Sequence, residues 1–255
     1  MILQSIIDII ESVAPRDKQE EWDNSGLQVG DTSAEISAAL LTTDVTEAVV
    51  NEAISLGCNL IISHHPLIFH PLRHLTGQSQ TERCVETCIR HHIAVYSAHT
   101  TMDKFLHGVS GRMAEKMGIT DYDIMFPDAE GYGLGVVGNL PEALTPEEFL
   151  LQLQAAFNAP WLRYTSSPKE KIQKAAFCGG AGGDMTYLAV QSGADVYVSA
   201  DFRYHQFQEF ENDIMVVDMD HWVSEHFTRD IFAELLAGKV RTFIAKSDKS
   251  PIQIV

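Results

Sequence analysis

Two histidines follow a run of isoleucines in the sequence IISHHPLIFH, residues 61–70. The apolar run is typical of a buried strand, which would place His64 and His65 at its carboxyl end. Pro66 favours an extended backbone at His65 and so fixes the direction of the pair. Adjacent strand residues point to opposite sides, so the two histidines cannot easily bind one ion, but each can bind one of two neighbouring ions. The alternative is a strand that simply ends in polar residues.

A second motif, DMDHWVSEHF at residues 218–227, favours the metal interpretation. His221 and Glu225 are four residues apart at the start of an expected helix, which places both on one helix face. Asp103 in SAHTTMD follows another expected strand and adds a fifth ligand. Glu225 could instead be an acid that complements the helix dipole, but that role does not account for the histidine.

The ligand types indicate which metals such a site would bind. Imidazole and carboxylate groups without thiolate suit zinc, iron, manganese or nickel. Two such ions about 3.5–4 Å apart, with a shared carboxylate, form a two-metal hydrolytic site. We therefore expect two divalent ions per chain, held by His64, His65, Asp103, His221 and Glu225.

Two further segments combine polar groups with turn residues. The glycines of CGGAGG, Cys178–Gly183, would let backbone N–H groups approach an anion at a helix start, although a tight strand-to-helix turn explains them equally well or better. SADFRYHQ, residues 199–206, carries Asp201, Tyr204 and His205 after an expected strand. These side chains either line the same cleft or belong to an ordinary surface loop.

The elements that must position these residues alternate between strands and helices. Expected strands at 37–43, 59–63 and 93–97 are separated by expected helices at 45–56 and 81–91. Such alternation predicts βαβ units with a largely parallel sheet, and so an α/β fold. A passage with turn signals at 120–144 divides the chain into an N-terminal lobe, residues 1–125, and a C-terminal lobe, residues 126–255. Because each lobe supplies ligands, the binuclear site is expected between the lobes.

The composition excludes some classes of function. The chain has 255 residues, 45% of them apolar and 21% charged, with 18 basic against 35 acidic residues and a formal charge of −17. This charge disfavours general binding to nucleic acids or anionic membranes but permits a nucleotide beside a bound dication. The start, MILQSIIDIIESVAP, lacks a basic segment and a cleavage site, and no apolar run approaches the length of a bilayer span. We therefore expect a cytoplasmic protein.

The motifs together resemble the NIF-three-like proteins, which are named GTP cyclohydrolase 1 type 2 homologues. The resemblance extends from the first helix to the C-terminus and is carried by the segments EWDNSGLQVG, SHHPLIF, SAHTTMD, CGGAGG, SADFRYH and DHWVSE. It implies two α/β lobes with a binuclear metal site between them, commonly in a toroidal homohexamer. The family's ligand positions correspond to the five residues already singled out, with Glu225 as the bridge.

Two functions follow from this resemblance. The first is a metal-dependent hydrolase acting on a nucleotide, with opening of the guanine ring of GTP as one reaction. Glu225 would be occupied as a ligand, so His99 and His205 are the candidate bases, and Asp23, Asn24, Asp201 and Tyr204 are candidates for lining the substrate. The second is a non-catalytic metal-binding ring that acts through protein partners.

Overall fold

The computed structural model describes residues 1–128 and 130–254, which divide into two compact units. Unit 1 comprises Met1–Met102 and His226–Lys249, and unit 2 comprises Asp103–Glu225 together with the segment that starts at Ser250. Both units are therefore discontinuous in sequence, whereas the sequence pattern predicted two continuous lobes. The cause in unit 1 is a C-terminal strand that returns to the first sheet.

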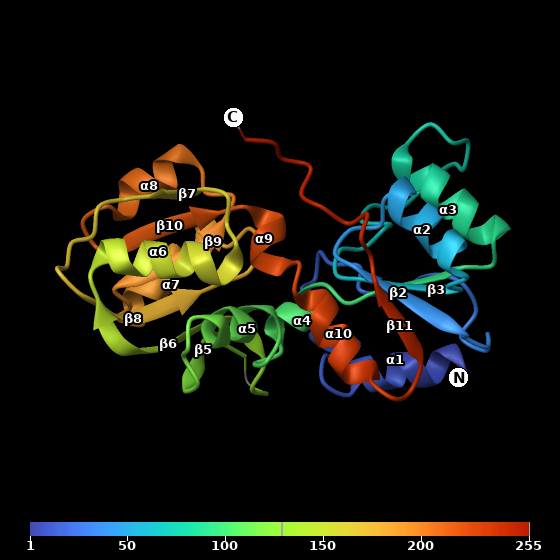
Figure 1. Ribbon diagram of the computed structural model, residues 1–255, viewed down its shortest axis with the longest axis horizontal. Helices are drawn as coiled ribbons and strands as arrows, with labels where there is room; N and C mark the ends of the chain where they lie inside the picture. Colours follow the sequence, from blue (N-terminus) through green and yellow to red (C-terminus); the bar gives the residue numbers. More distant parts are fainter. Residues whose placement is uncertain (129, 255) are drawn as a thin grey trace. The chain divides into compact units, whose positions relative to one another are not determined.

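Unit 1 is built on a five-stranded sheet in the order β1-β4-β3-β2-β11 (Figure 1). β2, β3, β4 and β11 are parallel, and β1 pairs antiparallel with β4 at one edge. The bounds of the strands are Gly26–Val29 (β1), Ala38–Thr42 (β2), Leu60–Ser63 (β3), Ala94–Ser97 (β4) and Arg241–Ile244 (β11). Because β2, β3 and β4 are parallel, their carboxyl ends meet at one edge of the sheet, and the polar residues that follow them gather there.

Helices cover both faces of this sheet. Figure 1 shows α2 (Glu47–Leu56) and α3 (Gln80–Arg90) on one face, and α1 (Leu3–Glu11) and α10 (Thr228–Leu236) on the other. The first pair packs apolar side chains against the strands in a single core cluster that includes Leu40, Val49, Ile61, Cys84 and Val95. Residues 60–63 and 94–97 are all buried, which agrees with the continuous apolar runs seen in the sequence.

Unit 2 contains a six-stranded mixed sheet in the order β5-β6-β8-β9-β10-β7. β8, β9 and β10 are parallel, and the other three strands join antiparallel. The bounds are Tyr122–Pro127 (β5), Gly133–Leu144 (β6), Leu162–Tyr164 (β7), Ile172–Phe177 (β8), Val196–Ala200 (β9) and Met215–Met219 (β10). The helices of this unit are α5 (Val109–Lys116), α6 (Pro146–Phe157), α7 (Thr186–Gln191), α8 (Tyr204–Phe210) and α9 (His221–Glu225); the short helix α4 (Thr100–Lys104) spans the first passage between the units.

The structure confirms a mixed α/β fold with two sheets flanked by helices, and it corrects two local expectations. The stretch 120–144, expected to be a passage with turn signals, contains the antiparallel pair of β5 and β6. The apolar pattern from Trp222 to about Ala237 predicts one long helix, but the structure divides this stretch into α9 and α10. At the break, the side chain of Phe227 is buried. Arg229 Nε donates to the carbonyl oxygen of His226 at 2.7 Å, and this bond satisfies a carbonyl that a continuous helix would pair with a backbone N–H group.

Across residues 1–128 and 130–254, none of the helices is both long and apolar enough to cross a membrane. The four cysteines are free and buried, and burial raises the pKa of the Cys88 thiol to about 12. Their burial is typical of small hydrophobic packing residues.

Candidate functional site

The histidine pair lies where the sequence predicted, directly after β3. The backbone N–H groups of His64 and His65 donate to the carbonyls of Thr42 and Thr43 at 3.1 and 2.9 Å, so the pair remains bonded to the end of β2 although β3 ends at Ser63. Ser63 Oγ lies 2.8 Å from the carbonyl of His65 and 2.8 Å from Ser97 Oγ. These bonds fix the backbone from which both rings project.

Each ring is oriented by an oxygen acceptor on its Nδ1 atom. His64 Nδ1 lies 3.1 Å from the carbonyl of Ala98, and His65 Nδ1 lies 2.9 Å from Asp44 Oδ1. A carbonyl oxygen can only accept, so Nδ1 of His64 carries the hydrogen and Nε2 presents the lone pair. The contact with the Asp44 carboxylate likewise places a hydrogen on Nδ1 of His65. An oxygen acceptor behind the ring is the usual arrangement for a histidine that binds a metal through its other nitrogen.

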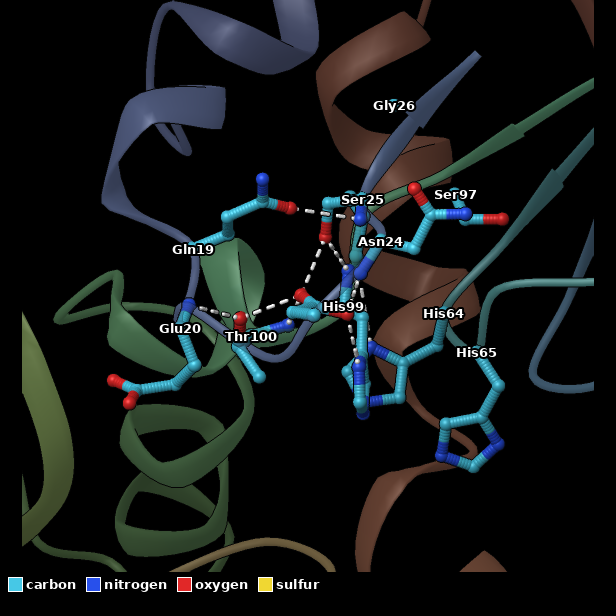
Figure 2. Close-up of polar contacts among 12 residues, drawn as sticks. Gln19, Glu20, Asn24, Ser25, Gly26, His64, His65, Ser97, His99 and Thr100 are labelled. Carbon is cyan, nitrogen blue, oxygen red and sulfur yellow. Dashed lines mark hydrogen bonds and ion pairs between the residues drawn. The ribbon is translucent and has the colours of Figure 1, made fainter. Parts of the chain in front are cut away.

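His99 repeats this arrangement with Asp23. His99 Nδ1 lies 2.8 Å from Asp23 Oδ1. The backbone N–H of His99 donates to Ser25 Oγ at 3.0 Å, and Figure 2 shows these two residues. Asp23 Oδ2 accepts from Thr100 Oγ1 at 2.6 Å and from Ser25 Oγ at 2.8 Å. Burial acts to raise the pKa of Asp23, but the bonds from His99, Thr100 and Ser25 outweigh it and lower the pKa. Asp23 is therefore a charged anchor for the His99 ring.

The three histidines of unit 1 form one cluster. The ring centroids of His64 and His65 are 4.9 Å apart. The ring centroid of His99 lies 5.3 Å from that of His64 and 5.4 Å from that of His65. One ligand nitrogen from each ring lies within 4.8 Å of the others. Figure 2 shows that the three side chains come from neighbouring strand ends. The spacing suits one ion or two adjacent ions.

Unit 2 contributes a second pair of ligand-type side chains on α9. His221 Nε2 lies 3.0 Å from Glu225 Oε2, as the four-residue spacing predicted. His221 Nδ1 lies 2.7 Å from Asp201 Oδ2. Asp201 follows β9 and has a φ of 58°, a left-handed conformation that is uncommon outside glycine. This backbone strain is retained at the residue that orients His221.

Two carboxylates determine the protonation of His221. Burial acts to lower its pKa, but Glu225 and Asp201, one at each ring nitrogen, outweigh it and raise the pKa to about 11. The same pairing lowers the pKa of Asp201. A metal ion at Nε2 would replace a proton there, because a histidine binds metal in its neutral form.

The CGGAGG segment is a tight turn that accommodates Glu225. The backbone N–H groups of Gly180 and Gly182 donate to Ser224 Oγ and Ser199 Oγ at 3.0 and 2.9 Å. These two amides are therefore used within the protein, which favours the turn interpretation over an anion cradle. Gly180 has a φ of +63°, and a Cβ atom there would lie 2.1 Å from Glu225 Oε1.

The remaining predicted residues occupy different surroundings. Asn24 Nδ2 donates to the carbonyl of Ile68 at 2.6 Å, which ties the loop before β1 to the loop after β3. Asp103 lies in α4, four residues after His99. Tyr204 and His205 begin α8 and are exposed, with ring centroids 5.3 Å apart. Within the described residues, no hydrogen bond or ion pair is found between His205 and Asp201 or His221.

Asp44 was not predicted from the sequence. It precedes its partner His65 by 21 residues, and nothing in the local pattern TTDVTEA distinguishes it from an ordinary acid after a strand. Its position after β2, next to β3 in a parallel sheet, was the available signal, because adjacent strand ends meet.

The whole chain is similar to a known family and to curated relatives. The family model described as Duf34/NIF3 (NGG1p interacting factor 3) matches residues 1–251. A Lactococcus lactis protein named GTP cyclohydrolase 1 type 2 homolog is 36% identical over 238 residues, which cover 91% of this chain and 89% of the relative. A Clostridium perfringens protein of the same name is 32% identical over 262 residues, which cover 100% of both chains.

Solved structures show the same fold. A hypothetical protein of Staphylococcus aureus matches with a TM-score of 0.89 and 26% identity, covering 100% of this chain and 99% of that one. A Bacillus cereus protein related to NIF3 matches with a TM-score of 0.90 at 23% identity, with the same coverage, and this likeness concerns the fold alone.

Proposed function

Because this chain belongs to the Duf34/NIF3 family, we propose that it is a hydrolase that depends on two divalent metal ions and acts on a nucleotide. The relatives' name, GTP cyclohydrolase 1 type 2 homolog, supports a guanine nucleotide as the first substrate to test. The observation that carries the proposal is the histidine cluster of unit 1, in which every Nδ1 atom faces an oxygen acceptor.

The donor set fits zinc, iron, manganese or nickel. His64 and His65 are each oriented by an oxygen acceptor at Nδ1, and His221, Glu225 and Asp103 add imidazole and carboxylate groups to the donor set. We propose that these five residues hold the two ions, with Glu225 as the shared carboxylate. When bound, such ions act as Lewis acids toward an oxygen of the substrate.

His99 is the stronger of the two candidate bases. Its Nδ1–H group is held by a buried carboxylate that lies within a network of hydrogen bonds, so Nε2 is left to accept a proton. A base needs a fixed orientation, and Asp23 provides one to His99. His205 is exposed at the start of α8 and has no comparable carboxylate partner among the described residues. We therefore assign the proton transfer to His99.

Metal analysis combined with a nucleotide panel tests the proposal. Protein that is stripped, reloaded with zinc, manganese, iron or nickel and dialysed should retain about two equivalents of metal and hydrolyse at least one nucleotide. His64→Gln should lose metal and activity together. His99→Gln should retain the metal and lose about 10²–10⁴-fold in rate, the usual contribution of a general base. Metal content near zero in the reloaded wild type would refute the proposed centre.

A cytoplasmic location is part of the same proposal. The free, buried cysteines agree with a reducing compartment, where disulfides are rare. Fractionation of cells that express the tagged protein would test this location.

A further inference from the structure

Two large aromatic side chains stand exposed beside the histidine cluster of unit 1. Trp22 is 59% exposed and Phe69 is 41% exposed. Their ring centroids are 6.0 Å apart with an angle of 47° between the ring planes, so the rings are tilted and are not stacked on each other. Because both rings are partly exposed and not stacked on each other, each has surface that a third ring could contact.

The loops that carry these rings are fastened to each other. Asn24 Nδ2 donates to the carbonyl of Ile68 at 2.6 Å, and Gln28 Oε1 accepts from the backbone N–H of Ile68 at 3.3 Å. Trp22 is next to Asp23, whose carboxylate is held by His99 and Thr100, and Phe69 is next to Ile68. The two rings are thus exposed and also fixed in place, which lowers the entropy cost of binding a ligand between them.

Both rings adjoin the proposed base. The centroid of Trp22 lies 5.8 Å from that of His99 at 72°, and the centroid of Phe69 lies 6.2 Å from it at 71°. Both pairs are T-shaped contacts, in which the ring planes are steeply inclined to the imidazole. A planar ligand that contacts Trp22 and Phe69 would therefore lie close to His99.

The local charge indicates that the ligand also carries an anionic group. Arg73 follows Phe69 by four residues and is exposed, whereas Glu20, Glu21 and Asp23 lie beside Trp22 in the sequence. An anionic group of the ligand is therefore expected on the side of Phe69 and Arg73, away from the acids beside Trp22. A heteroaromatic ring with attached phosphate has both properties.

We propose that Trp22 and Phe69 form a stacking platform for the planar heteroaromatic ring of a phosphorylated substrate. The inference rests on the proposed function only in taking this ligand as the substrate processed at His99. Stacking on aromatic side chains tolerates different ring identities, so the platform selects a class of ligand and not one base.

Equilibrium dialysis of the metal-loaded full chain tests the platform. The probes are GTP, ATP and inorganic tripolyphosphate, which lacks a ring. Trp22→Ala and Phe69→Ala should each weaken the binding of GTP and ATP about tenfold, which is the scale expected for lost stacking. The affinity for tripolyphosphate should not change. Trp22→Phe should restore most of the affinity. Phe126→Ala removes a 51% exposed aromatic ring in unit 2 and should change nothing.

Three results would overturn the inference. The first is wild-type protein that binds GTP and ATP no more tightly than tripolyphosphate. The second is an equal loss of affinity for all three probes in Trp22→Ala. The third is a change of sedimentation coefficient without a change of nucleotide affinity, which would make the aromatic pair a contact between copies of the chain. Metal content is measured on the same samples, so a failure of the platform is distinct from a failure of the metal centre.

Discussion

The carboxylate of Glu225 packs directly against Gly180: a Cβ atom on Gly180 would lie 2.1 Å from the Oε1 atom of Glu225. The carboxylate therefore occupies the position that any other residue at 180 would fill with its side chain. The glycine at position 180 is therefore required by the position of the Glu225 carboxylate, and not only by the flexibility of the loop.

Gly180→Ala should displace Glu225 and lower metal content, in addition to a cost of about 1–2 kcal/mol for a non-glycine residue in the left-handed region. Gly193→Ala is the matched control, because Gly193 has a φ of +74° and nothing within 4 Å of its Cβ position. It should lose a similar amount of stability and retain its metal. Equal metal content in the two variants would show that the carboxylate does not bind metal from this position.

Glu225→Gln separates a bridging ligand from an acid at a helix start. If Glu225 is shared by two ions, the variant retains the shape but loses the charge, and both ions should be lost together. If it only complements the dipole of α9, the change should cost about 0.3–1 kcal/mol and leave the metal in place. His65→Ala is the comparison, because it should weaken mainly one of the two ions. Elemental analysis after dialysis distinguishes the cases.

Removal of the metal should destabilise the protein. A ligand present at 100 times its dissociation constant stabilises the folded state by about 2.7 kcal/mol, which corresponds to roughly 5–10 °C in Tm for a chain of this size. Calorimetry before and after chelation measures the shift, and added zinc should reverse it. The Tm of His64→Gln should respond little to either treatment. An unchanged wild-type Tm would contradict a site formed only in the folded protein.

The stability of unit 2 should depend on the charge of Asp195. Asp195 Oδ2 accepts from the backbone N–H groups of Gln173 and Lys174, each at 2.8 Å, and Oδ1 contacts Lys169. Burial acts to raise the pKa of Asp195, but the Lys169 and backbone bonds outweigh it and lower the pKa. A depressed pKa stabilises the fold above the unfolded value, near 4, and this stabilisation is lost as the pH falls below it.

Asp195→Asn should therefore lose about 1.5–3 kcal/mol at pH 7, and the difference from wild type should shrink as the pH falls below about 4. Urea titrations at both pH values measure it. Lys169→Met removes the ion pair but leaves both backbone bonds, so it should have a smaller effect. A deficit in the asparagine variant that does not vary with pH would mean that shape, and not charge, accounts for the loss.

Local patterns predicted the parts of the site that local geometry determines. The four-residue spacing of His221 and Glu225 and the strand before His64 were both visible in the sequence, since each depends only on the period of its own element. The acceptors Asp44 and Asp23 precede their histidine partners by 21 and 76 residues. These pairings depend on the assembled sheet, so no local pattern predicts them.

Two elements of the fold were missed for similar reasons. β6 contains Gly133, Gly135 and Gly138, and glycines inside a strand weaken the alternation by which strands are recognised. The break between α9 and α10 depends on the buried Phe227 and on the bond from Arg229, neither of which interrupts the helical pattern. In both cases, packing and not propensity decides the structure.

The place of β11 in the first sheet has a consequence for synthesis on the ribosome. β11 pairs with β2, and the backbone N–H of Thr43 donates to Asp248 Oδ2 across 205 positions of the chain. At about 5–20 residues per second, β2 waits about 10–40 s for the partner that completes its edge. Its apolar edge is open to other chains during that interval. The nascent protein should therefore bind chaperones until its last residues emerge, and truncation before Arg241 should yield aggregates instead of a folded first unit.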